Sequence, residues 1–122
     1  MKQILVVDDS ATMRRMVMAS LQKSIKDITF NEASNGLEAI ERLVLAPANL
    51  IILDLNMPDM HGLEVLQFVR SHQTYSHIPI IVLTTKGDPK SRTEALEAGA
   101  SKYMTKPFEP NSFAAQVLEL LS

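Results

Sequence analysis

Five residues whose types can carry out chemistry stand at, or directly after, the ends of short strand-like runs. They are Asp8, Asp9, Asp54, Thr84 and Lys106. Phosphoryl transfer uses such groups together: a carboxylate attacks, oxygen ligands bind a hard cation, and hydroxyl and ammonium groups hold phosphoryl oxygens. The residue types therefore favour phosphoryl chemistry.

The expected chemistry centres on Asp54. Three carboxylates in one crevice repel one another unless cations are present, and Lys106 offsets only one of the charges. An all-oxygen site rich in carboxylates suits Mg²⁺, with Mn²⁺ as an alternative. Asp54 would then be the nucleophile and become an acyl phosphate, while Lys106 and the Thr84 hydroxyl would each bind a phosphoryl oxygen.

These residues must first be brought together, because they are scattered along the sequence. A single Asp after a strand more often caps a helix or forms a turn than carries out chemistry. In an open parallel α/β sheet, however, the carboxyl ends of all strands lie along one edge, where the binding crevice forms. Because several strand ends carry such residues, we expect the five side chains to converge at that edge.

The strands that position them are predicted by short runs of Ile, Val and Leu that do not alternate with polar residues. Such runs are typical of strands covered on both faces. The strong candidates are residues 4–7, 50–53 and 78–83, and the weaker ones are 28–33 and 100–105.

Apolar residues at helical spacing predict helices between these strands. The expected buried faces are Met13, Met16, Val17 and Leu21; Leu37, Ile40, Leu43 and Val44; Gly62, Val65, Leu66 and Val69; and Phe113, Val117, Leu118 and Leu121. A further helix over 89–98 has Asp88 as its N-cap, Pro89 at its first position and a thin apolar face of Ala95 and Leu96. Five strands alternating with five helices predict an α/β fold with a parallel sheet.

Composition narrows the class of protein. The 122 residues suit one domain over 1–122, and 46% hydrophobic residues allow a substantial core. The net charge is −2 and basic residues are scattered, so Arg14 and Arg15 are expected on a solvated helix face and no nucleic-acid partner is expected. The absence of cysteine excludes thiolate metal sites, and no apolar run reaches membrane-spanning length. We therefore expect a cytoplasmic protein without a membrane partner.

Other site types fit less well. His61, His72 and His77 lack metal-ligand spacing and are expected at the surface or in turns. Neither a Walker-type phosphate loop nor a dinucleotide-binding fingerprint is present.

The chain resembles the receiver domains of bacterial response regulators over essentially its whole length. The resemblance rests on Asp8-Asp9, on residues 54–62 (DLNMPDMHG), on Leu83-Thr84 and on residues 106–108 (KPF). Residues 11–17 (ATMRRMV) and Tyr103 further resemble the stand-alone, CheY-like members of the family.

The resemblance implies a flavodoxin-like (βα)5 three-layer sandwich with strand order 2-1-3-4-5. It also implies that Asp9, Asp54 and the backbone carbonyl of Asn56 bind Mg²⁺ directly, and that Asp8 acts through water. On phosphorylation the hydroxyl of Thr84 would move toward the phosphoryl group and the ring of Tyr103 would turn inward. That change would repack the face formed by the fourth helix, the fifth strand and the fifth helix, which would bind a downstream protein.

The resemblance further implies that Lys106–Pro107 is a cis peptide bond, whereas sequence alone leaves its state open. In the family, Asn56 and Lys86 flank the path of the water that hydrolyses the acyl phosphate. The sequence leaves the lifetime of the phosphorylated state open.

The expected function is that of a single-domain response regulator in a two-component phosphorelay, rather than that of an enzyme in the ordinary sense. A histidine kinase would supply the phosphoryl group to Asp54, and a protein partner, in chemotaxis for example, would receive the signal. The alternatives are a phosphorelay intermediate or phosphate sink that does not bind a motor switch, a haloacid-dehalogenase-like phosphatase, and an interaction module that is never phosphorylated. The phosphatase family needs a second acid two residues after its nucleophile, where this chain has Asn56.

Overall fold

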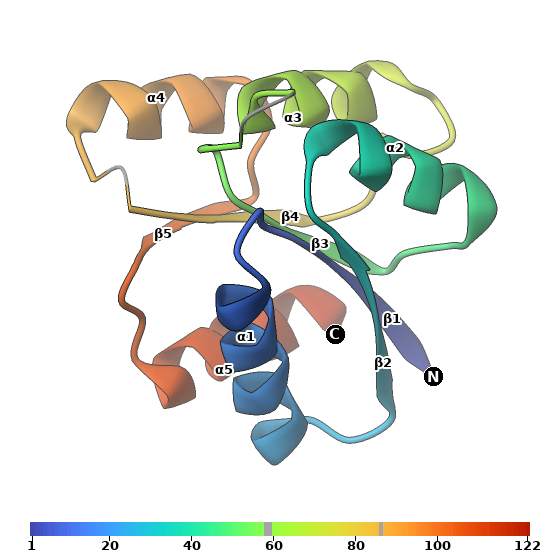
Figure 1. Ribbon diagram of the computed structural model, residues 1–122, viewed down its shortest axis with the longest axis vertical. Coiled ribbons are helices and arrows are strands. Elements are labelled where there is room, and N and C mark those ends of the chain that lie inside the picture. The colour runs from blue at the N-terminus through green and yellow to red at the C-terminus, as the bar shows by residue number, and fades with distance from the viewer. Residues whose placement is uncertain (58–59, 86) are drawn as a thin grey trace.

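Five parallel strands form one central sheet in the computed structural model of the chain (Figure 1), in the order β2-β1-β3-β4-β5. The strands are β1 (Lys2–Val7), β2 (Ile28–Ala33), β3 (Leu50–Leu53), β4 (Ile80–Thr84) and β5 (Lys102–Thr105). The structure describes residues 1–57, 60–85 and 87–122. The flavodoxin-like fold class and the strand order that the sequence implied are both confirmed.

Helices cover both faces of this sheet. They are α1 (Ala11–Ser24), α2 (Gly36–Leu45), α3 (Gly62–Ser71), α4 (Pro89–Glu97) and α5 (Pro110–Leu121). In Figure 1, α1 and α5 lie on one side of the sheet, and α2, α3 and α4 lie on the other.

Strand β1 shows why the apolar runs are continuous. Successive side chains of a strand point to opposite faces, so Leu5 and Val7 enter the core cluster on one side of the sheet and Ile4 and Val6 enter the cluster on the other. All four side chains are buried. Helices on both faces therefore require apolar residues at every position of a central strand.

Two strands begin later than the apolar runs indicated. Strand β4 begins at Ile80 rather than at residue 78, and β5 begins at Lys102 rather than at residue 100. In the second case the N–H of Ala100 donates to the carbonyl of Ala95, so this residue closes the end of α4 and does not enter the sheet. An apolar run does not show whether its first residue enters the strand or closes the end of the preceding helix.

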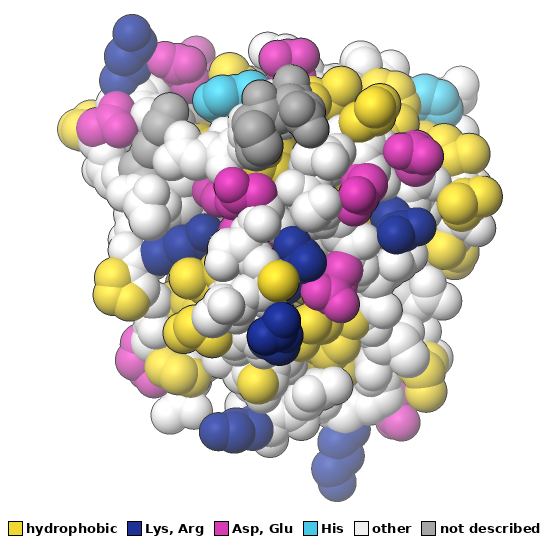
Figure 2. All heavy atoms as spheres, viewed as in Figure 1, with side chains coloured by type: hydrophobic (Ala, Val, Ile, Leu, Met, Phe, Trp, Pro, Cys, Tyr) yellow, Lys and Arg dark blue, Asp and Glu magenta, His cyan; other side chains and the backbone are white. Residues whose placement is uncertain are grey.

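The predicted helix faces are correct for α3 but partly wrong elsewhere. Met16, Leu37, Val44 and Leu118 were expected to be buried, and they are 50%, 58%, 65% and 50% exposed. In α2 the buried positions are Gly36, Ala39 and Leu43, so the small Ala39 rather than a larger neighbour faces the sheet. Hydrophobic side chains consequently lie on the surface over α2, at the right of Figure 2.

The start of α4 agrees with its sequence signals. Asp88 caps the helix by accepting a hydrogen bond from Ser91 N at 3.0 Å, and Pro89 occupies the first turn. Ala95 is the buried residue of this helix, whereas Leu96 is 39% exposed. The helix therefore attaches to the sheet through a small apolar contact.

None of the helices in the described part of the chain combines the length and the apolar character needed to cross a lipid bilayer.

Candidate functional site

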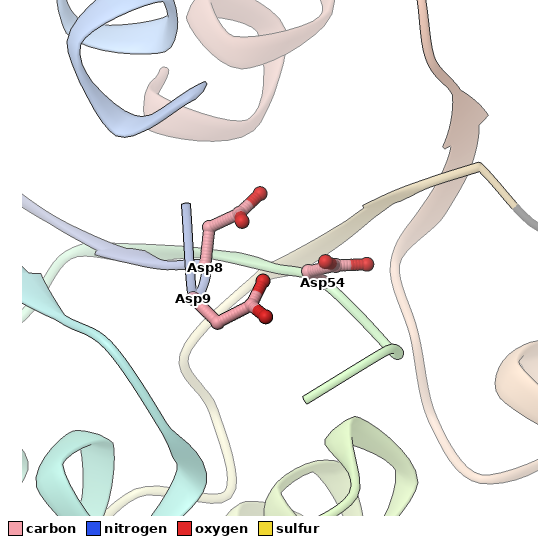
Figure 3. A group of neighbouring side chains, drawn as sticks. All are labelled: Asp8, Asp9 and Asp54. Atoms are coloured by element: carbon pink, nitrogen blue, oxygen red, sulfur yellow. The ribbon is translucent and has the colours of Figure 1, made fainter. Parts of the chain in front are cut away.

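Three carboxylates meet at the carboxyl ends of β1 and β3. The backbone N–H of Asp54 donates to Val7 O at 3.0 Å, which holds the end of β3 against the end of β1. One carboxylate oxygen from each of Asp8, Asp9 and Asp54 lies within 4.8 Å of the others, and Figure 3 shows the three side chains around one space. Asp8 and Asp54 are buried, while Asp9 is exposed. The expected convergence of these three residues is therefore observed.

Lys106 enters the same cluster from the end of β5. Its Nζ donates to Asp8 Oδ2 at 2.7 Å and lies 3.4 Å from Asp54 Oδ2. Its side chain is only 8% exposed, so these interactions take place largely out of water. One ammonium group facing three carboxylates leaves an excess of negative charge, which a divalent cation bound by oxygen would offset.

Thr84 completes the set from β4. It is fully buried at the end of that strand, and its carbonyl accepts a hydrogen bond from Lys106 N at 2.9 Å. The ends of four strands thus supply the five residues that the sequence singled out. The Lys106–Pro107 bond that follows is cis, as the resemblance implied.

Backbone N–H groups hold the second carboxylate oxygen of Asp8 and of Asp54. Ser10 N donates to Asp8 Oδ1 at 2.9 Å, and Asn56 N donates to Asp54 Oδ1 at 3.2 Å. Ser10 also caps α1, because its hydroxyl accepts from Met13 N. The orientations of the two buried carboxylates are therefore fixed by the chain segments that directly follow their strands.

The model of the response regulator receiver domain family matches residues 4–118. The chain belongs to this family. The chemotaxis protein CheY1 of Helicobacter pylori is 43% identical over 110 residues, which is 88% of this chain and 87% of the relative.

Solved receiver structures agree with this assignment. The chemotaxis protein CheY4 of Vibrio cholerae superposes with a TM-score of 0.89 at 35% identity, covering 99% of both chains. The Mn²⁺-bound form of response regulator Rcp1 superposes with a TM-score of 0.84 at 31% identity, covering 98% of this chain and 91% of that one. CheY-like receiver domains are signalling proteins rather than classical enzymes.

The acidic cluster of this receiver domain fits a divalent cation. Asp8, Asp9 and Asp54 supply oxygen donors within 4.8 Å of one another, and such donors suit Mg²⁺ and Mn²⁺. Asn56, whose carbonyl the resemblance adds to the ligand set, lies in the loop after β3 and is exposed. Its side-chain Nδ2 lies 3.4 Å from Thr85 Oγ1, so the loops after β3 and β4 touch beside Asp54.

Gly62, the last residue of the motif over 54–62, allows α3 to begin close to Asp54. A Cβ at this position would overlap the carbonyl oxygen of Asp54 and lie 2.6 Å from Leu55 Cα. Gly62 N also donates to Leu55 O at 3.2 Å. The motif therefore ends in glycine because the helix packs directly on the segment that carries Asp54. Within the same motif, Pro58 and Asp59 lie outside the described residues, as does Lys86.

Tyr103 lies on β5, away from the acidic cluster along the sheet. It is 9% exposed and belongs to the same core cluster as Ala95 of α4. The guanidinium carbon of Arg92 lies 5.8 Å from the centre of its ring. Burial raises the pKa of Tyr103, the charge of Asp88 raises it further, and Arg92 opposes them. The ring thus lies between β5 and α4, and the role of rotamer switch that the resemblance implied for it stays a prediction.

One residue close to the site, Arg14, was not predicted from the sequence. It was expected on a solvated helix face, but its side chain is only 15% exposed. Its guanidinium donates to the backbone carbonyl of Asp8 at 2.6 Å and to Glu32 Oε1 at 2.8 Å. The sequence spacing could have indicated this position. Arg14 lies one helical turn after the N-cap Ser10, so its side chain is close to Asp8 and Asp9.

The three histidines take no part in the site. All three are exposed, and His61 caps α3 through its Nδ1, which accepts from Leu63 N. The ring of His72 stacks on that of Tyr75 at 4.7 Å between ring centres. The expectation of surface or turn positions is confirmed.

Proposed function

We propose that residues 1–122 work as one receiver unit that accepts a phosphoryl group from a histidine kinase on Asp54 with Mg²⁺. The observation that carries this proposal is the surroundings of the Asp54 carboxylate. It lies in reach of Asp8 and Asp9, and the ammonium of Lys106 is 3.4 Å away. Membership of the receiver domain family favours a site of action in the cytoplasm.

In the proposed reaction a carboxylate oxygen of Asp54 attacks the phosphorus of a phosphohistidine. The P–N bond breaks, its electron pair returns to the histidine nitrogen, and an acyl phosphate forms on Asp54. Asp8, Asp9, Asp54 and the Asn56 carbonyl would hold Mg²⁺, which neutralises charge on phosphoryl oxygens when bound. Hydrolysis later releases inorganic phosphate and restores the carboxylate.

Lys106 and Thr84 act on the phosphoryl oxygens in this proposal. Lys106 already points its ammonium at two carboxylates, so a small movement toward Asp54 brings it to a phosphoryl oxygen. The Thr84 hydroxyl binds another oxygen. Thr84 is the last residue of β4 and Lys106 directly follows β5, so regular strands position both residues.

The signal leaves through the face formed by α4, β5 and α5. α4 is held by few apolar side chains, so shifting it costs little, and Tyr103 lies beneath it as the proposed rotamer switch. A hollow of about 270 Å³ on this face is lined by Arg92, Leu96, Ser101, Lys102, Tyr103, Met104 and Gln116. A downstream protein would bind here after the packing of α4 and Tyr103 changes.

The similarity to chemotaxis proteins from two bacteria favours a role in chemotaxis. A phosphorelay intermediate or phosphate sink would share the whole site and differ only in lacking a motor-switch partner. Binding of the phosphorylated form to a flagellar switch protein separates these roles.

Intact-mass measurement after incubation with acetyl phosphate and Mg²⁺ tests the proposed function. We expect one labile phosphoryl adduct per chain, which is absent from Asp54→Asn. Rapid turnover of many phosphoesters without an adduct would support a phosphatase instead. No adduct and no turnover would support an interaction module that is never phosphorylated.

A further inference from the structure

Arg14 makes two hydrogen bonds that link α1 to Asp8, directly after β1, and to Glu32 of β2. Its Nη1 donates to the carbonyl oxygen of Asp8 at 2.6 Å, and its Nε donates to Glu32 Oε1 at 2.8 Å. Glu32 comes near the end of β2, whose register places it opposite Val6 of β1. The guanidinium therefore ties the start of α1 to the ends of two neighbouring strands.

The carbonyl that Arg14 binds belongs to the peptide group between Asp8 and Asp9. Fixing the plane of that peptide restricts the backbone dihedral angles on either side of it, and with them the direction of the Asp9 side chain. The Asp8 carboxylate has other partners, Ser10 N and Lys106. Among the described residues none hydrogen-bonds the Asp9 carboxylate, so its direction depends on the backbone that carries it.

Charge alone would make Arg14 unfavourable at this place. A guanidinium beside a cluster that binds a divalent cation repels that cation. Glu32 offsets the positive charge of Arg14, because its Oε1 lies 2.8 Å from Arg14 Nε. Figure 2 shows basic and acidic side chains next to one another near the centre of the view. With its charge offset, Arg14 can hold the Asp8 carbonyl with less cost to cation binding.

We propose that Arg14 is a positioning residue for the metal site, which orients the Asp9 carboxylate by binding the Asp8 carbonyl, and that Glu32 offsets its charge. This inference rests on the proposed function only in using the same acidic cluster. It assigns Arg14 no contact with the cation. The positioning depends on the hydrogen bond from Arg14 to the backbone carbonyl of Asp8.

The sign of the change in Mn²⁺ affinity tests this inference, with free Mn²⁺ measured by electron paramagnetic resonance. Charge alone predicts that Arg14→Ala binds Mn²⁺ more tightly, since a nearby cation is removed. Positioning predicts weaker binding, by about tenfold, which is typical when a residue that orients a metal ligand is lost. Arg15→Ala is the matched control: it removes the same charge from an exposed neighbour, and it should leave affinity unchanged or slightly tighter.

Two further measurements separate positioning from misfolding. In Arg14→Ala the Mg²⁺ concentration that half-saturates phosphoryl uptake from acetyl phosphate should rise, while the rate at saturating Mg²⁺ stays near that of the wild type. Glu32→Gln should weaken Mn²⁺ binding in the wild type and have a smaller effect in the Arg14→Ala background, because Glu32 acts on Arg14.

Mn²⁺ binding by Arg14→Ala that equals or exceeds that of the wild type would overturn the inference. So would a lower rate at saturating Mg²⁺ with unchanged half-saturation. If the wild type binds Mn²⁺ but takes up no phosphoryl group, the proposed function fails while the positioning role of Arg14 stands or falls on the Mn²⁺ data alone.

Discussion

Lys106 donates a 2.7 Å hydrogen bond to Asp8, a residue 98 positions earlier in the sequence, and both side chains are almost completely removed from water. The same ammonium group lies 3.4 Å from Asp54. Lys106 is thus a countercharge shared by two buried carboxylates, and it competes with a divalent cation for that role.

Replacing Lys106 with Met should therefore lower the free energy of unfolding by about 3–5 kcal/mol when EDTA is present, because two buried carboxylates lose their cation. Saturating Mg²⁺ should recover part of the loss, since a ligand that binds only the folded state stabilises it. Urea unfolding with EDTA and with Mg²⁺ measures both quantities. Lys102→Met is the matched control, because its partner Glu119 is 69% exposed and such surface pairs contribute about 0–1 kcal/mol. A loss of equal size in EDTA and Mg²⁺ would contradict the shared role.

Gly62→Ala should destabilise the protein and disturb Asp54 together. The new Cβ would overlap the Asp54 carbonyl oxygen, which is backbone and cannot move aside cheaply, so we expect a loss of about 1–3 kcal/mol and slower phosphoryl uptake. Gly87→Ala places a Cβ 3.5 Å from Thr105 Cγ2, an ordinary contact, and serves as control. Thermal unfolding and uptake from acetyl phosphate check both variants. Equal behaviour of the two would show that the approach of α3 to Asp54 does not matter.

Tyr103 should make stability depend on pH in the alkaline range. Burial raises the pKa of its phenol above the ordinary value of 10.0, so the folded state favours the neutral ring. The stabilisation is fully present below pH 10 and is lost as the pH rises through the folded-state pKa. Urea unfolding between neutral pH and strongly alkaline pH should show a steeper decline for the wild type than for Tyr103→Phe. Tyr75→Phe, which leaves Tyr103 in place, should keep the wild-type slope; a slope that follows Tyr75 would refute the assignment.

Arg70 should anchor the end of α4. Its guanidinium donates to the carbonyls of Gly99 at 2.8 Å, Ile78 at 2.7 Å and Ser76 at 3.1 Å, and burial lowers the pKa of this group. Arg70→Met keeps the apolar stem but leaves these carbonyls without their donor, which should cost about 1–3 kcal/mol. Amide hydrogen exchange should speed up around residues 98–101, while β1 amides change no more than global stability requires. Uniform acceleration throughout the chain would argue against a local anchor.

The sheet and the site were predictable from sequence for one shared reason. Strands covered on both faces need continuous apolar runs, and the residue that follows each run marks a strand end. Asp54 and Thr84 could therefore be placed at one edge before any contact was known. Alternation of strands and helices indicates a parallel sheet, in which the carboxyl ends of all strands lie along the same edge.

The positions that could not be predicted depend on distances between elements. Helical spacing puts Leu37 and Val44 on an apolar stripe, but α2 turns Ala39 toward the sheet and leaves both of them exposed. In the sequence, Arg14 is one of two adjacent basic residues expected on a solvated helix face. Its hydrogen bond to Glu32 forms only because β2 lies beside β1 in the sheet. A periodic pattern predicts on which face of its own helix a side chain lies. It does not predict which residue of another element that side chain contacts.

The most direct test of the central claim is to locate the phosphoryl group. Borohydride reduces an acyl phosphate on Asp to homoserine, so the protein should be phosphorylated with acetyl phosphate and Mg²⁺, reduced, digested and sequenced by mass spectrometry. We predict homoserine at position 54 and at neither position 8 nor position 9, with none formed when Mg²⁺ is replaced by EDTA. Homoserine at position 8 or 9, or a phosphoryl group that resists borohydride on a Ser or Thr, would contradict the assignment of Asp54.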